Sequence, residues 1–111
     1  MYISLRDCMV MGGEFESPAA GMKALGVEAV EIELRDDFSV CAMDSLDRLT
    51  LDTDADAEAY RKHLDGLGIQ PCSFLTACDW SIGEMEKNIA WVARAIELAD
   101  LLGMPNVRID S

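Results

Sequence analysis

The chain has 111 residues, half of them apolar, and its formal net charge is −12 from 21 acidic and 9 basic side chains. This length fits one ordinary domain or part of one, and the apolar content is too high for a disordered chain. The acidic balance argues against nucleic acid and membrane surfaces as partners, since both attract basic patches. No apolar run approaches the ~20 residues that cross a bilayer, and no signal peptide is evident. We therefore expect a cytoplasmic protein.

The four cysteines do not predict a zinc site. The spacings of Cys8, Cys41, Cys72 and Cys78 fit no zinc-ligand pattern, and His63 is the single histidine. Without a secretion signal we expect reduced thiols that pack in the core. Cys8 and Cys78 lie near predicted strand ends and are the first candidates for another role. His63 is expected at the surface of a helix.

One sequence pattern occurs three times along the chain, at residues 24–32, 66–74 and 101–109. In each, a helical stretch stops at a glycine (Gly26, Gly68 or Gly103) and a β-prone run follows at once. Glycine adopts the left-handed conformation that ends a helix without a steric penalty from Cβ. The pattern therefore predicts a helix that turns directly into a strand.

The helices before these glycines have start signals of their own. Ser17 precedes a proline at the first helical position, and Thr53 or Asp54 can cap the second helix. Ser81 and Glu84 fit a capping box at the start of the third helix.

Two apolar stripes at helical spacing run along the third helix. The first consists of Met85, Ile89, Val92, Ile96 and Ala99, and the second of Trp91, Ala95, Leu98 and Leu102. This wide apolar face predicts burial against a sheet and neighbouring helices. If no further helix follows, we expect the Trp91 side to be left exposed.

The predicted elements alternate between strand and helix. They are strand 2–6, helix 17–25, strand 27–33, helix 54–67, strand 69–78, helix 84–102 and strand 106–110. This order is typical of parallel α/β structure. Residues 35–53 are too long for a routine connection, and residues 40–43 and 48–51 are expected to pair as a small hairpin.

Most of the predicted strands are apolar on one face and ionic on the other. In the second strand Val30, Ile32 and Leu34 alternate with Glu31 and Glu33. The first and fourth strands repeat this pattern, whereas the faces of the third strand cannot be assigned. Strands covered on both faces would be almost continuously apolar, so helices are expected on one face only.

Right-handed crossovers then place the strands parallel in the order 1-2-3-4, as in half of a TIM-type barrel. A closed barrel needs about 250 residues. We therefore interpret residues 1–111 as a single partial (β/α) barrel domain without its C-terminal half. It is an N-terminal fragment, a truncated gene product or a natural half-barrel.

The sequence resembles the sugar phosphate isomerase/epimerase family, which has a xylose isomerase-like barrel. The similar stretches are residues 26–32, 60–69 and 95–103, the last leading into 106–110. The resemblance implies a divalent metal (Mn, Mg, Co or Zn) and a sugar or sugar phosphate as substrate. It also implies isomerisation or epimerisation by proton transfer next to a carbonyl. The family's metal ligands come mostly from later strands, and only its second-strand glutamate has a clear match here, at Glu31. The resemblance therefore implies a half that is inactive alone and does not hold the metal.

The candidate catalytic residues are Glu31 and Glu33, which point the same way from one strand. Paired carboxylates can hold a metal or serve as acid and base, with one pKa raised by the other. The candidate substrate-binding residues are Arg6, Asp79, Arg108 and Asp110. The alternative for the two glutamates is an ion-pair layer with Arg6 and Arg108 that fills the barrel, and for the two aspartates helix capping or solvation. Asp7 is a further, weaker candidate.

A second function of a different class is also consistent with this pattern. The predicted first and fourth strands are sheet edges, whose unpaired backbone groups invite pairing with another chain. The alternative is thus a non-catalytic α/β module that self-associates or docks on a partner through its open edges. In either case we expect a homo-oligomer. Within one chain, we expect Arg108 to lie within salt-bridge reach of Glu31 or Glu33.

Overall fold

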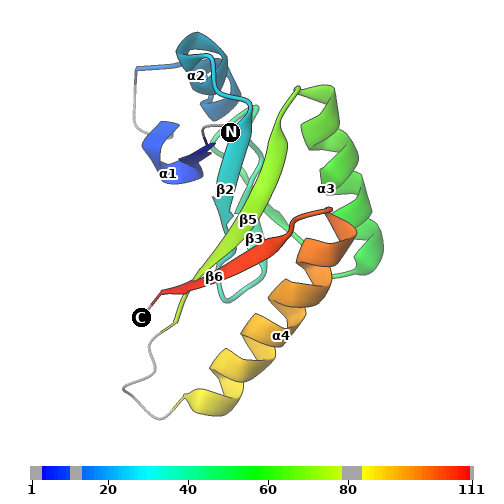
Figure 1. Cartoon of the computed structure of the whole chain (residues 1–111). Helices are drawn as coiled ribbons and strands as arrows, with labels where there is room; N and C mark the ends of the chain where they lie inside the picture. The colour runs from blue at the N-terminus through cyan, green and yellow to red at the C-terminus, as the bar shows by residue number, and fades with distance from the viewer. Residues whose placement is uncertain (1–3, 11–13, 79–83, 111) are drawn as a thin grey trace.

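In the computed structural model, residues 4–10, 14–78 and 84–110 are described, and they alternate between strand and helix (Figure 1). The elements are β1 (Ser4–Arg6), α1 (Asp7–Val10), α2 (Pro18–Leu25), β2 (Ala29–Glu33), β3 (Ser39–Cys41), β4 (Arg48–Thr50), α3 (Asp54–Gly66), β5 (Gln70–Ala77), α4 (Met85–Leu101) and β6 (Asn106–Asp110). Every predicted helix and strand is present, with ends that shift by one or two residues. The short helix α1 was not predicted.

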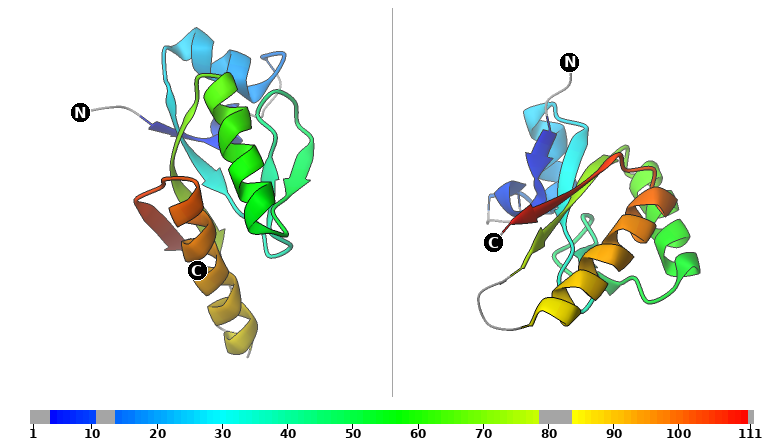
Figure 2. Two further views of the ribbon diagram at one scale, coloured as in Figure 1. Left: turned by 90° about the vertical axis from the view of Figure 1, so that its right-hand side faces the viewer. Right: turned by 60° about the horizontal axis from the view of Figure 1, so that its bottom comes forward.

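The main sheet is parallel throughout, in the order β1-β2-β5-β6. This confirms the predicted order of the four strands. Met22 of α2, Leu64 of α3 and Leu98 of α4 belong to the same buried cluster as Val30 and Ile32 of β2. The three long helices therefore cover one face, as expected, and Figure 2 (left) shows α3 and α4 in front of the sheet.

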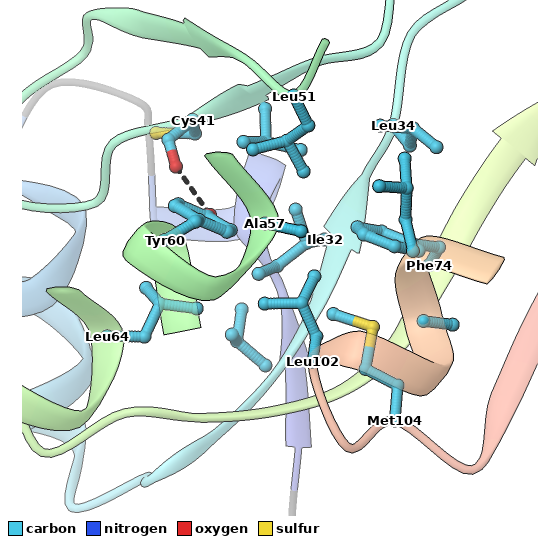
Figure 3. Close-up of a cluster of buried hydrophobic side chains, with 14 of the residues drawn as sticks. Ile32, Leu34, Cys41, Leu51, Ala57, Tyr60, Leu64, Phe74, Leu102 and Met104 are labelled. Carbon is cyan, nitrogen blue, oxygen red and sulfur yellow. Dashed lines mark hydrogen bonds between the residues drawn. The ribbon is translucent and has the colours of Figure 1, made fainter. Parts of the chain in front are cut away.

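The core lies between this face and the helices (Figure 3). Val30, Ile32 and Leu34 are fully buried, so the predicted apolar face of the second strand is confirmed. Ile32 lies opposite Phe74 of β5, which is also fully buried. Burying side chains of this size stabilises the fold by about 1.5–3 kcal/mol each.

The helix ends mostly follow the predicted signals. Ser17 Oγ accepts a hydrogen bond from the Ala20 amide at 3.1 Å, and Thr53 forms a reciprocal capping box with Asp56. The three glycines that follow the helices all have φ near +70°. At α4 the predicted capping box is wrong. Ser81 lies outside the described residues, and Glu84 is itself the N-cap, without a side-chain cap hydrogen bond, rather than the third helical residue.

The predicted hairpin within residues 35–53 is confirmed, since β3 and β4 pair antiparallel with Val40 opposite Leu49. It is packed between α2 and α3. The Ala19 amide donates to the Met43 carbonyl at 2.8 Å, and Tyr60 Oη donates to the Cys41 carbonyl at 2.7 Å (Figure 3). On α3, His63 Nε2 lies 2.7 Å from the carbonyl oxygen of Ala42. The histidine, which was expected at the surface, thus forms a hydrogen bond with the hairpin segment. The long connection thus forms part of the helical layer.

A β-bulge explains why the faces of the third predicted strand could not be assigned. Val30 pairs with Pro71 and Glu31 pairs with Ser73, so Cys72 has no partner of its own in the register. An extra residue of this kind breaks the alternation of side chains between the faces. As a result, Ser73 comes to lie on the face of Glu31.

The expectation about the exposed side of the third helix is wrong. Trp91 is only 8% exposed, because its stripe faces the core together with Ala95 and Leu98. The other stripe is left open, and Ile89 and Ile96 are more than half exposed.

Three of the four cysteines pack in the core as expected, whereas Cys8 does not. All four are free, with Cys41, Cys72 and Cys78 buried and Cys8 exposed on α1.

Among the described residues, no helix combines the length and apolar character needed to cross a membrane.

Candidate functional site

Glu31 is the centre of a polar layer on the face of the sheet opposite the helices. Its Oε1 lies 3.2 Å from Arg108 Nη1 and 3.8 Å from Arg6 Nε, and its Oε2 accepts a hydrogen bond from Ser73 Oγ at 2.8 Å. The predicted contact between Arg108 and Glu31 is therefore confirmed. Since β1, β2, β5 and β6 each contribute one side chain, the layer spans all four strands. The Glu31 side chain is only 14% exposed, which strengthens these charged contacts relative to those in bulk water.

Arg108 is held from its other side by Asp110. Two hydrogen bonds of 3.0 Å, from Nε and Nη2, join the guanidinium to both carboxylate oxygens. Such a bidentate pair fixes the plane of the guanidinium. Arg6 is held more loosely, because its Nε is enclosed but has no hydrogen-bond partner among the described residues. The Arg6 distance of 3.8 Å to Glu31 is that of an ion pair without a hydrogen bond.

A pair of carboxyl groups lies beyond this layer, at the carboxyl ends of β1 and β2. Asp7, the first residue of α1, is 2% exposed, and its Oδ2 accepts a hydrogen bond from the Glu33 amide at 3.1 Å. Burial raises the pKa of the Asp7 carboxyl, although the hydrogen bonds from Glu33 and Cys8 oppose the rise. The Glu33 side chain is half-exposed, with Arg35 Nε at 4.0 Å from its Oε1. The two carboxyl groups thus have different surroundings, as an acid–base site requires.

Glu33 also lines a cavity of about 320 Å³ at the carboxyl end of the sheet. Arg35, Lys87 and Trp91 contribute to its wall, and Trp91 Nε1 has no hydrogen-bond partner among the described residues. Ligands of parallel α/β sheets bind at this end of the strands. A larger cavity of about 480 Å³ lies at the amino end, between α2 and α3, and has a mainly apolar wall. It is remote from the carboxyl pair and does not belong to this site.

The described residues do not fit the divalent metal that the resemblance implies. No group of three or more His, Cys, Asp or Glu side chains in this part of the chain could hold an ion. Glu31, the one residue that matches the family pattern, already binds two guanidinium groups and a hydroxyl with its two oxygens. A metal at this carboxylate would compete with the two guanidinium groups for the same negative charge.

The structure brings together four of the six predicted site residues, namely Arg6, Glu31, Arg108 and Asp110. Glu33 lies further toward the carboxyl end of β2, and Asp79 lies outside the described residues. Two partners were not predicted. Ser73 was hidden by the β-bulge, whereas Arg35 follows Glu33 by two residues and could have been found from the spacing.

Comparison with known protein families finds no match, and neither the curated proteins nor the solved structures contain one.

Proposed function

We propose that this chain is the substrate-binding half of a (β/α)8 barrel of the sugar (phosphate) isomerase/epimerase type. Sequential parallel strands with all long helices on one face support this architecture, because doubly wound sheets reverse their strand order. The polar layer on the opposite face corresponds to the interior of such a barrel. The family assignment itself rests on the sequence resemblance.

The observation that carries the proposal is the pair of arginines that flank Glu31 on the open face of the sheet, with Glu33 two residues further along β2. Arg6 and Arg108 both contact Glu31, which holds their guanidinium groups on the open face. Guanidinium groups bind phosphate and carboxylate through paired N–H donors. A sugar phosphate fits this arrangement, with its anionic group on Arg6 and its carbonyl end toward Glu33.

In this proposal Glu33 is the catalytic base. It removes a proton from the carbon next to the carbonyl; the C–H electron pair becomes a C=C bond and the carbonyl π pair moves onto the carbonyl oxygen, which gives an enediolate. In isomerisation the proton returns to the former carbonyl carbon, while the hydroxyl proton of the neighbouring carbon passes to the former carbonyl oxygen. In epimerisation a proton from solvent adds to the opposite face of the carbon that lost its proton. Asp7 is a positioning residue, since it acts on Glu33 through the backbone amide.

In the family that the sequence resembles, the divalent metal would stabilise the enediolate, and the described residues include no group that could hold it. The proposal therefore predicts binding without turnover by this chain alone.

An NMR titration of the labelled chain with glucose 6-phosphate tests the proposal, with glucose and inorganic phosphate as separate probes. We expect saturable amide shifts at Arg6, Glu31 and Glu33, and we expect Arg6→Met to weaken binding about tenfold because one charge-assisted contact is lost.

Lys23→Met is the matched control, because it removes an exposed cation from α2 at the amino end of the sheet. It should leave the affinity unchanged. Shifts that do not saturate, or an equal loss of affinity in both variants, would overturn the proposal. Binding of inorganic phosphate alone, with no response to the sugar, would reduce it to a general anion site.

A further inference from the structure

The outer side of α4 and β6 forms an apolar face that nothing in the described chain covers. The stripe at positions 85, 89, 92 and 96 runs along it, and Ile96 is 57% exposed. Ile109 of β6 is 49% exposed beside this stripe. Between helix and strand lies a groove of about 350 Å³, lined by Val92, Ile96, Val107 and Ile109 among others. Figure 1 shows the two elements side by side at the edge of the molecule.

The same edge has free backbone hydrogen-bonding groups. The Asp110 carbonyl accepts a hydrogen bond from the Cys78 amide at 2.7 Å, so Asp110 faces β5. Successive residues of a strand direct their N–H and C=O groups to alternate sides. Val107 and Ile109 therefore present theirs outward, where no described strand pairs with β6. An edge strand of this kind is a template for another strand.

We infer that a second copy of this chain covers this face, with β6 pairing antiparallel to its counterpart and α4 packing on the partner's α4. The edge is self-complementary: the two outward residues lie symmetrically about Arg108, so a two-fold axis there places Val107 opposite the partner's Ile109. The stripe on α4 has the 4-3-4 spacing of helices that pack along a common seam. One symmetric contact thus covers both the strand edge and the helix stripe.

The distribution of charge favours a second copy at this face. Of the described residues that line the groove, only Asp100 is charged, in a chain of net charge −12. Repulsion between two acidic molecules is weaker at such a face than at one lined by carboxylates. The two Arg108 side chains would lie near the axis on the opposite face of the sheet, and each is already paired with Glu31 and Asp110.

This inference is tested separately from the proposed function. It concerns the helix side and one edge of the sheet, whereas the sugar phosphate site lies on the other face. In a complete barrel the next strand would occupy the same edge, so the oligomeric state of the 111-residue chain is decisive.

Sedimentation velocity at low and high salt tests the inference. We expect a dimer that becomes tighter as salt screens the net charge, within about 10 Å at 0.1 M. Ile96→Glu should raise the dissociation constant at least about tenfold, because it places a charge in the seam. Leu46→Glu is the matched control, since it adds the same charge at an equally exposed apolar residue in the hairpin turn, and it should leave the dimer intact.

A second variant probes the strand edge. Ile109→Pro removes an amide that faces away from β5, so the sheet within one copy is retained while pairing across the edge is blocked. Hydrogen exchange of the wild-type chain should show protection at the Val107 and Ile109 amides, and Ile96→Glu should abolish it. A monomer at both salt concentrations would overturn the inference. So would a dimer that resists both variants, or one whose Val107 and Ile109 amides exchange freely.

Discussion

Strands β2 and β6 have the same alternating sequence pattern but very different surroundings. Val30 and Ile32 of β2 are fully buried, whereas Val107 of β6 is half-buried and Ile109 is half-exposed. The reason is position: β2 lies between β1 and β5, and within the described part of the chain β6 has a neighbour on one side only. Alternation thus predicts which face of a strand is apolar. Whether that face is covered depends on elements that the strand itself does not specify.

The largest expected effect comes from truncating one isoleucine in each of the two strands. Ile32→Ala should lower the free energy of unfolding by about 3–4 kcal/mol, because it leaves a cavity in the packed core. Ile109→Ala should cost about 0.5 kcal/mol in the monomer, since its side chain has few neighbours to lose. Urea unfolding of dilute protein at low salt measures both, under conditions that disfavour the dimer. Equal losses would mean that β6 is as well covered as β2.

A smaller effect is expected for the ionic contact that links the two strands. Glu31→Gln should cost about 1–2 kcal/mol, because the Glu31 carboxylate that Arg6 and Arg108 share is itself largely enclosed. Arg108→Met should cost less than Glu31→Gln, since that guanidinium is half-exposed and screened by solvent. Urea unfolding at neutral pH again gives both values. If Arg108→Met lowered the free energy of unfolding more than Glu31→Gln does, the expectation that the enclosed Glu31 carboxylate contributes most to this contact would be wrong.

An effect of opposite sign is expected at the carboxyl end of β1. The pKa of Asp7 is raised by burial, so the folded chain binds this proton more tightly than the unfolded chain. Stability from this group is therefore present below the unfolded pKa and is lost as pH rises through the folded pKa. Asp7→Asn keeps an oxygen for the Glu33 amide and should stabilise the fold by about 1 kcal/mol at pH 7.

The gain from Asp7→Asn should vanish in acid, where the wild-type carboxyl is protonated. Asp37→Asn is an instructive control, because hydrogen bonds from Ser39 lower the pKa of Asp37. That variant should be neutral or destabilising at pH 7. A gain for Asp7→Asn that persists at low pH would show that its cause is not the titration of Asp7.

The strand order, the helix ends at glycine and the apolar face of β2 could all be predicted, because each follows from local spacing. The position of Ser73 could not, since the bulge at Cys72 changes the register without a signal in the alternation. The orientation of α4 was also beyond prediction. Its two stripes are equally apolar, and only contact with α3 and the sheet decides that the Trp91 stripe faces inward.

The burial of Asp7 could not be predicted either, because it depends on a short helix with no start signal. The sequence thus predicted Glu31 and its arginine partners but not the pairing of Asp7 with Glu33.

The hairpin packed between α2 and α3 has a consequence for how this sequence can vary. Connections in α/β proteins usually accept insertions and deletions. Here Val40, Cys41 and Met43 are buried in the common core, and the backbone of Met43 has φ of +72°. Shortening this segment would open the interior, so its length is as constrained as that of a strand. Only its turn at residues 44–47, with Leu46 exposed, offers a place where loop length can change freely.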